Sequence, residues 1–191
     1  DNNQYIVTTQ YTFRASVANA AERRADLVLL VNGLPLALVE AKTAVRQAVS
    51  WFDGAKQIHD DYERNVPELF ACNVLNVATE GKDLRYGAIH TPLEHWSPWI
   101  LDADERGERG ENLKNIRVNP RSSASPLKTL SISIPSLLRP NVLLDILAHF
   151  TLFATDKKKR RLKVICRYQQ YEAANKIVER VLAGSPRKGL I

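Results

Sequence analysis

The stretch RADLVLLVNGLPLALVEAK, residues 24–42, decides the fold that we expect for this chain. Its two apolar runs, Ala25–Val31 and Leu34–Ala41, flank the turn-forming pair Asn32-Gly33, so the pattern predicts two strands joined by a hairpin. Both faces of each run are apolar, which is typical of central strands that are covered on both sides. Three charged residues break the apolar pattern: Asp26, Glu40 and Lys42. Charges on such strands are costly unless they pair or bind something.

The length of the turn decides whether the two acids share a face of the sheet. A two-residue loop would place Asp26 opposite Val39 and would turn Glu40 to the other face. A three-residue loop, or a bulge in the hairpin, would place Asp26 opposite Glu40. Lys42 would then join them, because side chains in a strand alternate with a period of two. A shared site therefore requires an odd loop or a bulge.

Two carboxylates and an amine on one face are what a magnesium-dependent phosphodiesterase requires. Mg²⁺ takes hard oxygen ligands, usually one or two carboxylates plus a substrate phosphate. Asp26 and Glu40 can supply the carboxylates, and the carbonyl oxygen of Ala41 can point toward the same ion. Lys42 would lie near the attacking water. The alternative is a buried salt bridge between Lys42 and one of the acids, because structural ion-pair networks also place charged side chains on apolar strands.

The remaining pattern predicts an α/β protein. Expected strands are Tyr5–Arg14, Leu69–Thr79, Leu84–His90 and Phe150–Ala154, with a further short apolar run at Leu162–Cys166. Expected helices are Thr43–Arg64, Ser136–Phe150 and Tyr168–Ala183, the last ended by Gly184. Trp96 and Trp99 are interpreted as packing aromatics, with base stacking as the alternative. The polar segment 102–126 predicts a long surface loop, with a short helix at Glu111–Ile116.

Charge is distributed unevenly along the chain. Residues 1–155 hold 16 Lys and Arg against 18 Asp and Glu, whereas residues 156–191 hold 11 against 3, so the two parts carry −2 and +8 of the total +6. The basic part begins with Asp156–Arg161, sequence DKKKRR. This run is consistent with a phosphate-bearing partner or with a solvated linker. Net charge alone does not establish DNA binding.

Composition narrows the class of protein. No apolar run approaches the ~20 residues of a membrane helix, and no signal segment opens the chain. The two cysteines, Cys72 and Cys166, lie far apart, and the four histidines have no paired spacing, so neither a disulfide framework nor a zinc site is indicated. We therefore expect a cytoplasmic protein with reduced thiols and no membrane association.

The stretch 24–42 resembles the PD-(D/E)XK nuclease core of the R subunit of type I restriction-modification enzymes, and NGLPL between the acids is its most specific part. The resemblance continues through Gln57 and Tyr62, which match the Gln/Tyr element of the family, and through residues 66–70, VPELF. It implies a restriction-endonuclease-like mixed central sheet flanked by helices and Mg²⁺-dependent cleavage of double-stranded DNA. It also implies catalytic roles for Asp26, Glu40, Lys42, Gln57 and Tyr62, and metal binding by Asp26, Glu40 and Ala41.

Two positions depart from the family pattern. Ala25 stands where the family often has proline, which should alter only the entry to the strand. The spacing from Gln57 to Tyr62 is one residue longer than usual. This leaves two alternatives open: either both side chains reach the site, or Gln57 is exposed and Tyr62 is packed in the core.

The end of the chain resembles the approach to a superfamily 2 helicase-like motor, through residues 150–153 and 167–182. In such motors an Arg/Gln element contacts adenine, so the resemblance implies that Arg167 and Gln170 bind ATP. The final RKGLI resembles the segment before a P-loop, but no G-x-x-x-x-G-K-[ST] motif is present. We therefore expect ATP to serve the full-length subunit and not this fragment.

These expectations give two domains. Residues 1–150 would form an N-terminally truncated endonuclease domain, and residues 151–191 a linker with the start of a motor domain that is cut before its P-loop. Expected partners are double-stranded DNA and the modification and specificity subunits of a restriction complex. Two alternatives remain: a catalytically silent nuclease-like module for DNA binding or assembly, and a stand-alone DNA repair nuclease.

Overall fold

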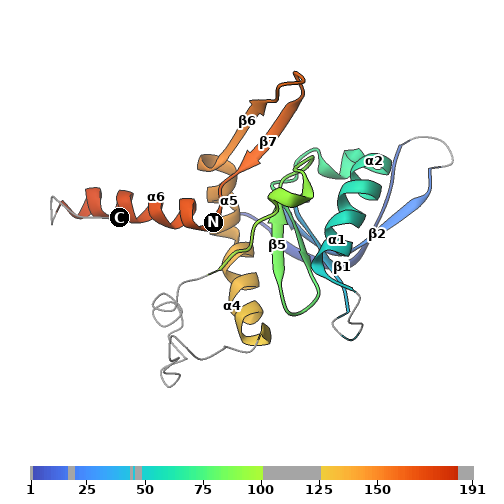
Figure 1. Ribbon diagram of the computed structural model, residues 1–191, viewed down its shortest axis with the longest axis horizontal. Helices are drawn as coiled ribbons and strands as arrows, with labels where there is room; N and C mark the ends of the chain where they lie inside the picture. The colour runs from blue at the N-terminus through green and yellow to red at the C-terminus, as the bar shows by residue number, and fades with distance from the viewer. Residues whose placement is uncertain (1, 17–19, 44, 46–48, 101–125, 185–191) are drawn as a thin grey trace.

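The computed structural model describes residues 2–16, 20–43, 45, 49–100 and 126–184. Within these residues a mixed five-stranded sheet carries helices on both faces, and a two-stranded hairpin extends away from it (Figure 1). The sheet strands follow chain order: β1 (Tyr5–Arg14), β2 (Glu22–Val31), β3 (Leu34–Ala41), β4 (Leu75–Thr79) and β5 (Leu84–Gly87). Strands β3 and β4 are parallel, and the other neighbours are antiparallel. The α/β class and the central position of the apolar hairpin are confirmed.

Each face of the sheet has its own hydrophobic core. One core joins Val28 and Leu38 to the helical segment that follows β3, through side chains such as Ile58. The other joins Val39 and Val77 to helices near the end of the described chain. Successive residues of β2 and β3 alternate between these cores, which is why both strands are apolar on both faces.

The helix after β3 begins later than expected. It starts as α1 (Trp51–Lys56), continues as the π-helix η1 (Gln57–Tyr62) and ends as α2 (Glu63–Asn65). Ser50 caps it in a capping box with Asp53, and this cap fixes the start. Helix was expected from Thr43, but Thr43, Val45, Val49 and Ser50 are not helical, and the residues between them lie outside the described part.

The expected strand Leu69–Thr79 is wrong in its first half. Residues Pro67–Phe70 form the 3₁₀-helix η2, because Pro67 favours the first helical position, and pairing begins only at Leu75. Strand β5 likewise ends at Gly87, before the expected His90. A 3₁₀-helix, η3 (Leu93–His95), leads to Trp96 and Trp99, which are 4% and 3% exposed. Both tryptophans therefore pack in the cores and are not available for base stacking.

The expected helix Ser136–Phe150 is two helices. Helix α4 (Pro126–Leu138) ends before Arg139, and α5 (Pro140–His149) begins with Pro140. The residue before a proline is driven to an extended conformation, and Arg139 has φ −57° and ψ 137°. The short helix expected at Glu111–Ile116 lies outside the described residues.

The last described elements are the hairpin β6 (Thr151–Thr155) and β7 (Arg161–Ile165), followed by α6 (Tyr168–Ala183). The hairpin strands lie within one residue of the expected ones, and α6 matches its expected bounds, with Gly184 left-handed at φ 68°. Tyr168 packs in the same core as α4 and α5. The domain boundary at residue 150 remains a prediction.

No single helix in the described ranges is long and apolar enough to cross a membrane. The segments Leu130–Leu138 and Pro140–His149 pass that test only together, and they are bent by 56°. Their buried side chains, Leu137, Leu143 and Ile146, contribute to the core on the sheet, which accounts for their apolar character.

Gly87 offers a test of the packing around Trp96. A Cβ atom added at Gly87 would lie 2.7 to 2.9 Å from three atoms of the buried indole ring. We expect Gly87→Ala to lower the free energy of unfolding by about 1–3 kcal/mol, as overpacking does in cores. Urea unfolding followed by circular dichroism measures this. The control Gly33→Asn sits in open space at a left-handed turn position and should cost less; equal costs for the two variants would contradict the packing.

Candidate active site

A bulge in β3 sets the register between the two acids. The turn itself is the two-residue Asn32-Gly33, with φ 52° and 81°. Next to the turn, Val31 pairs with Leu34 and Leu30 with Pro35. Further from the turn, Leu29 pairs with Ala37 and Leu27 with Val39. Leu36 has no partner in this ladder, so it is the extra residue of the bulge. Continuing this register places Asp26 opposite Glu40. The requirement for an odd loop or a bulge is confirmed, and a bulge satisfies it.

Asp26 is held by the strands on both sides of it. Its Oδ2 atom accepts a hydrogen bond of 2.9 Å from the backbone N–H of Ala41 in β3. Its Oδ1 atom accepts one of 3.3 Å from the side chain of Gln10 in β1. Gln10 is left-handed, with φ 53°, and it interrupts the ladder between the pairs that flank it. Such backbone conformations are costly for residues other than glycine and occur often at functional sites.

Glu40 is one of four side chains that form a closed hydrogen-bonded ring, and only 1% of it is exposed. Its Oε2 atom is 3.2 Å from Lys42 Nζ, and its Oε1 atom is 2.9 Å from the Tyr62 hydroxyl. Gln57 closes the ring, because its side chain accepts a hydrogen bond from Lys42 and donates one to Tyr62. Both carboxylate oxygens are therefore partnered, as a buried charge requires.

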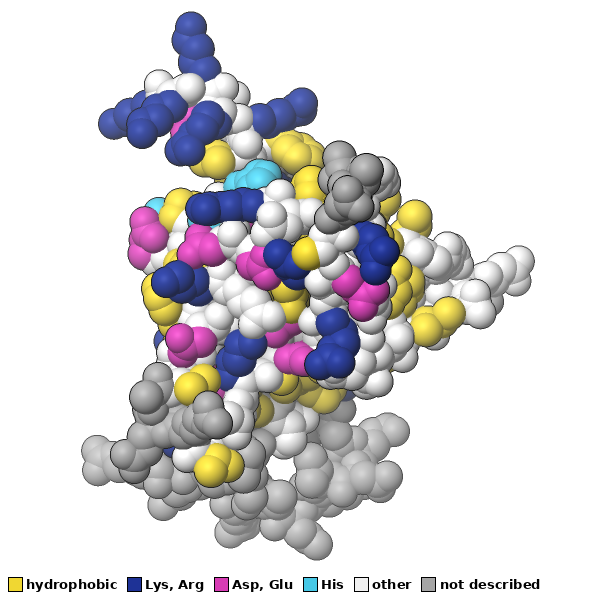
Figure 2. Space-filling model, turned by 90° about the vertical axis from the view of Figure 1, so that its right-hand side faces the viewer, with side chains coloured by type: hydrophobic (Ala, Val, Ile, Leu, Met, Phe, Trp, Pro, Cys, Tyr) yellow, Lys and Arg dark blue, Asp and Glu magenta, His cyan; other side chains and the backbone are white. Residues whose placement is uncertain are grey.

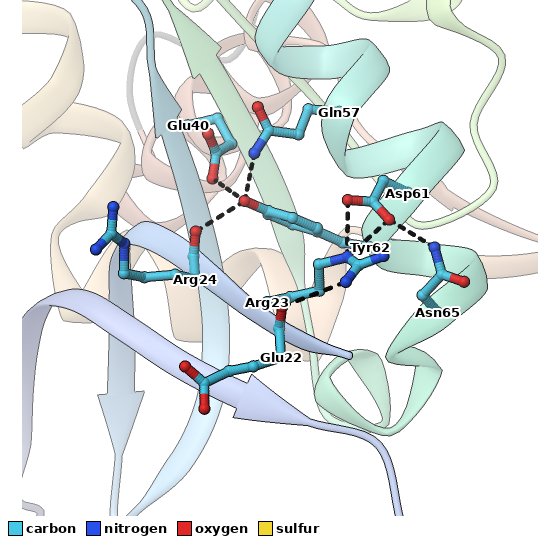
Figure 3. Close-up of polar contacts among 8 residues, drawn as sticks. All are labelled: Glu22, Arg23, Arg24, Glu40, Gln57, Asp61, Tyr62 and Asn65. Carbon is cyan, nitrogen blue, oxygen red and sulfur yellow. Dashed lines mark hydrogen bonds and ion pairs between the residues drawn. The ribbon is translucent and has the colours of Figure 1, made fainter. Parts of the chain in front are cut away.

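The Tyr62 hydroxyl is the meeting point of three elements (Figure 3). It lies 2.8 Å from the backbone carbonyl of Arg24 in β2 as well as near Glu40 in β3, and it receives the Gln57 amide from the helix. Its single proton can go to either oxygen. Burial and the charge of Glu40 raise the pKa of Tyr62, so the hydroxyl stays protonated at neutral pH.

The π-helix explains how Gln57 and Tyr62 can both reach the site although their spacing is unusual. Gln57 and Tyr62 are five residues apart, and η1 spans both of them. Side chains five apart diverge on an α-helix but share a face where the helix turns with i→i+5 hydrogen bonds. Arg23 in β2 also holds this turn through Asp61, at 2.8 and 2.9 Å (Figure 3). The expected exposure of Gln57 in the alternative is therefore wrong, whereas its packed Tyr62 is confirmed, because Tyr62 lies in the core and also reaches Glu40.

Burial and repulsion both disfavour a charged Glu40. The pKa of Glu40 is raised above its usual range, first because burial penalises the ionised carboxylate and next because Asp26 repels it. Lys42 and the Tyr62 hydroxyl oppose this effect without cancelling it. A cation placed between the two carboxylates would relieve the repulsion. Among the described residues no group of three or more His, Cys, Asp and Glu side chains gathers, so a metal here would have two side-chain carboxylates.

Arg167 and Gln170 lie apart from this ring, at the start of α6. The Gln170 side-chain oxygen accepts a hydrogen bond of 2.9 Å from the Arg167 backbone N–H, which caps the helix. Their expected contact with adenine remains a prediction. The structure thus brings together Asp26, Glu40, Ala41, Lys42, Gln57 and Tyr62. Sequence reasoning did not find Gln10 or the Arg24 carbonyl, and no motif marks either position.

Comparison with known proteins identifies a family for the part of the chain that holds these residues. The family model described as "Type I restriction enzyme R protein N terminus" matches residues 1–95, which include every strand and helix that contributes to the ring. This part of the chain belongs to the type I restriction enzyme R protein family. The sequence resemblance is confirmed at the level of the family.

Named relatives extend the similarity beyond residue 95. The HindI endonuclease subunit of a type I restriction enzyme from Haemophilus influenzae is 26% identical over 98% of this chain. Two putative type I restriction enzyme endonuclease subunits from Methanocaldococcus jannaschii, MjaIXP and MjaVIIP, are 25% and 28% identical over 95% and 100% of it. The chain spans only 16% to 17% of the length of these relatives.

The raised pKa of Glu40 predicts that the stability of this chain depends on pH. A carboxyl group whose pKa is higher in the folded than in the unfolded protein contributes stability below the unfolded value, near 4.5, and loses it as the pH rises through the folded pKa. Without metal, ionised Glu40 should therefore destabilise the fold at neutral pH. We expect Glu40→Gln to raise the melting temperature at pH 7.5 in EDTA, with the gain shrinking toward pH 4.

Differential scanning calorimetry across this pH range measures the effect. The matched control is Glu94→Gln, because Glu94 is an exposed carboxylate outside the ring. It should leave the melting temperature nearly unchanged at every pH. A Glu40→Gln variant that melts below wild type at pH 7.5 would show that the Lys42 and Tyr62 contacts outweigh the cost of burial.

Proposed function

We propose that this chain contains the Mg²⁺-dependent endonuclease domain of a type I restriction enzyme R subunit, and that it hydrolyses phosphodiester bonds of double-stranded DNA. The observation that carries the proposal is the buried ring around Glu40 with Asp26 across the bulge. It assembles two carboxylates and a lysine on one face, as the PD-(D/E)XK pattern requires. The relatives named as endonuclease subunits support the same reaction, and the mixed sheet with helices on both faces fits a restriction-endonuclease-like fold.

The residues present fit a magnesium ion. Asp26 and Glu40 would bind it with their carboxylates, and Ala41 would add its backbone carbonyl oxygen, a set of hard ligands of the kind that Mg²⁺ prefers. The backbone of Ala41 already lies next to the Asp26 carboxylate through its N–H. The repulsion that raises the pKa of Glu40 is the feature a divalent cation would offset. When bound, Mg²⁺ would polarise a phosphoryl oxygen and lower the pKa of a water molecule.

The side chains of the ring supply the remaining functions. Lys42 places its ammonium group beside the carboxylates, where it can stabilise negative charge that develops on a phosphate during attack by water. Glu40 and Gln57 fix its position. Tyr62 and Gln57 keep the Glu40 carboxylate oriented, so their contribution is positioning and not proton transfer; the raised pKa of Tyr62 agrees with this role.

We propose that the full R subunit moves DNA with the energy of ATP, acts with modification and specificity subunits, and uses this domain for cleavage. Arg167 and Gln170 would then contact adenine at the start of the motor. Because the Gln170 oxygen caps α6, its amide N–H₂ is the group left to face a nucleotide.

Metal binding tests the site directly. Titration of the 191-residue chain with Mn²⁺ or Ca²⁺ in a calorimeter should give one binding event that Asp26→Asn abolishes, because a single carboxylate holds these ions poorly. Glu94→Gln should bind as the wild type does. A wild-type chain that gives no heat with either ion would favour the catalytically silent module instead.

Cleavage tests the chemistry. In an assembled restriction enzyme that carries this domain, Lys42→Ala should lower the rate of DNA cleavage by about 10²-fold or more, as loss of one charge-stabilising group does in other enzymes. ATP hydrolysis by the same enzyme should be unchanged, because Lys42 lies outside the proposed motor. Normal cleavage by the variant, measured as linearisation of plasmid DNA, would overturn the assignment.

A further inference from the structure

The hairpin β6–β7 is the most basic part of the described chain. Residues 151–165 contain six Lys and Arg and one acid, Asp156, for a net charge of +5. The hairpin projects from the body of the molecule (Figure 1), and its tip shows a group of Lys and Arg side chains that radiate into solvent (Figure 2). The neighbouring part of the chain, residues 1–155, is slightly acidic. The basic charge is therefore concentrated on one extended element.

The tip is an ordered turn. Asp156 accepts hydrogen bonds of 2.8 Å from the backbone N–H groups of Lys158 and Arg160, and its other oxygen accepts one of 2.8 Å from the Arg160 side chain. Lys159 takes the left-handed conformation that closes the turn, with φ 62°. These bonds lower the pKa of Asp156, first through the Arg160 backbone N–H. The one acid of the hairpin is thus used inside the turn, where it pairs with Arg160.

The other cations differ in their surroundings. Midway along β7, Lys163 turns inward and donates to the backbone carbonyl of Asn73, which ties the strand to the body. Toward the tip, the Arg161 guanidinium lies over the Phe153 ring, 5.0 Å from its centre, and this contact limits its motion. The lysines 157–159 are exposed. They and Arg161 form a cluster of positive charge on a rigid support.

The hairpin borders a hollow that it shares with the active-site helix. This hollow has a volume of about 940 Å³, and its lining includes Trp51 of α1, His59 of the π-helix and Arg160 and Arg161 of the hairpin. Two acids, Asp60 and Glu94, also line it, so its positive charge comes from the hairpin side. The helix that lines one wall thus also carries Gln57 into the ring. A long polyanion held at the hairpin would run past this helix.

We propose that the β6–β7 hairpin is an arm that binds the phosphate backbone of double-stranded DNA. The proposal rests on the proposed function for its choice of DNA as the polyanion. A two-stranded ribbon is narrow enough to enter the major groove, and lysines on a fixed turn bind phosphates without reading bases. The arm holds the duplex beside the nuclease domain and contributes no sequence specificity. A merely solvated basic turn would make no localised contribution to DNA affinity.

The test compares two charge-matched triple variants of the 191-residue chain. The first is Lys157→Gln, Lys158→Gln and Lys159→Gln. The second, the control, removes three exposed cations away from the hairpin and the hollow: Arg14→Gln, Lys82→Gln and Arg139→Gln. Both lower the net charge by three. Binding to a labelled 30-base-pair duplex is followed by fluorescence anisotropy in EDTA, from 50 to 200 mM KCl, and circular dichroism verifies that both variants fold.

The hairpin variant should bind about tenfold or more weakly at 100 mM KCl. The slope of log affinity against log salt should fall by between two and three, because each lost phosphate contact contributes about 0.9. The control should change affinity less than threefold and leave the slope nearly unchanged. Equal behaviour of the two variants would overturn the proposal. So would unchanged binding by the hairpin variant, because the turn would then be a solvated basic turn.

A negative result in this experiment can be distinguished from a failure of the proposed nuclease function. Binding in EDTA needs no metal, so a chain whose ring binds no Mn²⁺ can still show or lack the effect of the hairpin. Conversely, a chain that binds Mn²⁺ through Asp26 but loses no DNA affinity in the hairpin variant would keep its nuclease assignment and lose only the arm.

Discussion

The carboxylate of Glu40 is the constraint on which the rest of the site depends. A buried charge must have its oxygens partnered. Here the partners come from Lys42, the residue directly after β3, and from Tyr62 in the helix. Gln57 then joins Lys42 to Tyr62, so that no member of the ring can move alone. Fixing these four side chains fixes the distance between sheet and helix. The repulsion between Glu40 and Asp26 is not cancelled within the ring, and it helps to keep the pKa of Glu40 raised.

Two local irregularities, a β-bulge and a π-helix, bring the side chains of the site together. Leu36 is the extra residue of the bulge that moves Glu40 level with Asp26. The π-helix accommodates one extra residue between Gln57 and Tyr62, so that both still face the sheet. Bulges and π-turns each disturb regular hydrogen bonding, and both occur often at functional sites because they redirect side chains. In this chain they act on opposite sides of one carboxylate, which makes the site depend on two local irregularities.

Periodicity predicted the regular elements and not the irregular ones. Strands Tyr5–Arg14 and Leu34–Ala41 and helix Tyr168–Ala183 have the expected bounds, because the strands are unbroken β-branched or apolar runs and a final glycine marks the end of the helix. The register argument reduced the hairpin to an odd loop or a bulge but could not choose, since the bulge depends on packing of Leu36 in three dimensions. The late start at Trp51 and the left-handed Gln10 were missed, because the first depends on a local cap and the second on contacts between strands.

Gly54 shows that close packing of the helix against β3 outweighs the low helix propensity of glycine. Glycine weakens a helix interior by about 1 kcal/mol relative to alanine, yet it stands within the six residues of α1. A Cβ atom at this position would lie 3.3 Å from the Cβ atoms of Glu40 and Ala78. The missing side chain therefore lets the helix approach β3 closely enough for Gln57 and Tyr62 to reach the carboxylate. The helix gives up intrinsic stability at Gly54, and the close contact over Glu40 is what it gains.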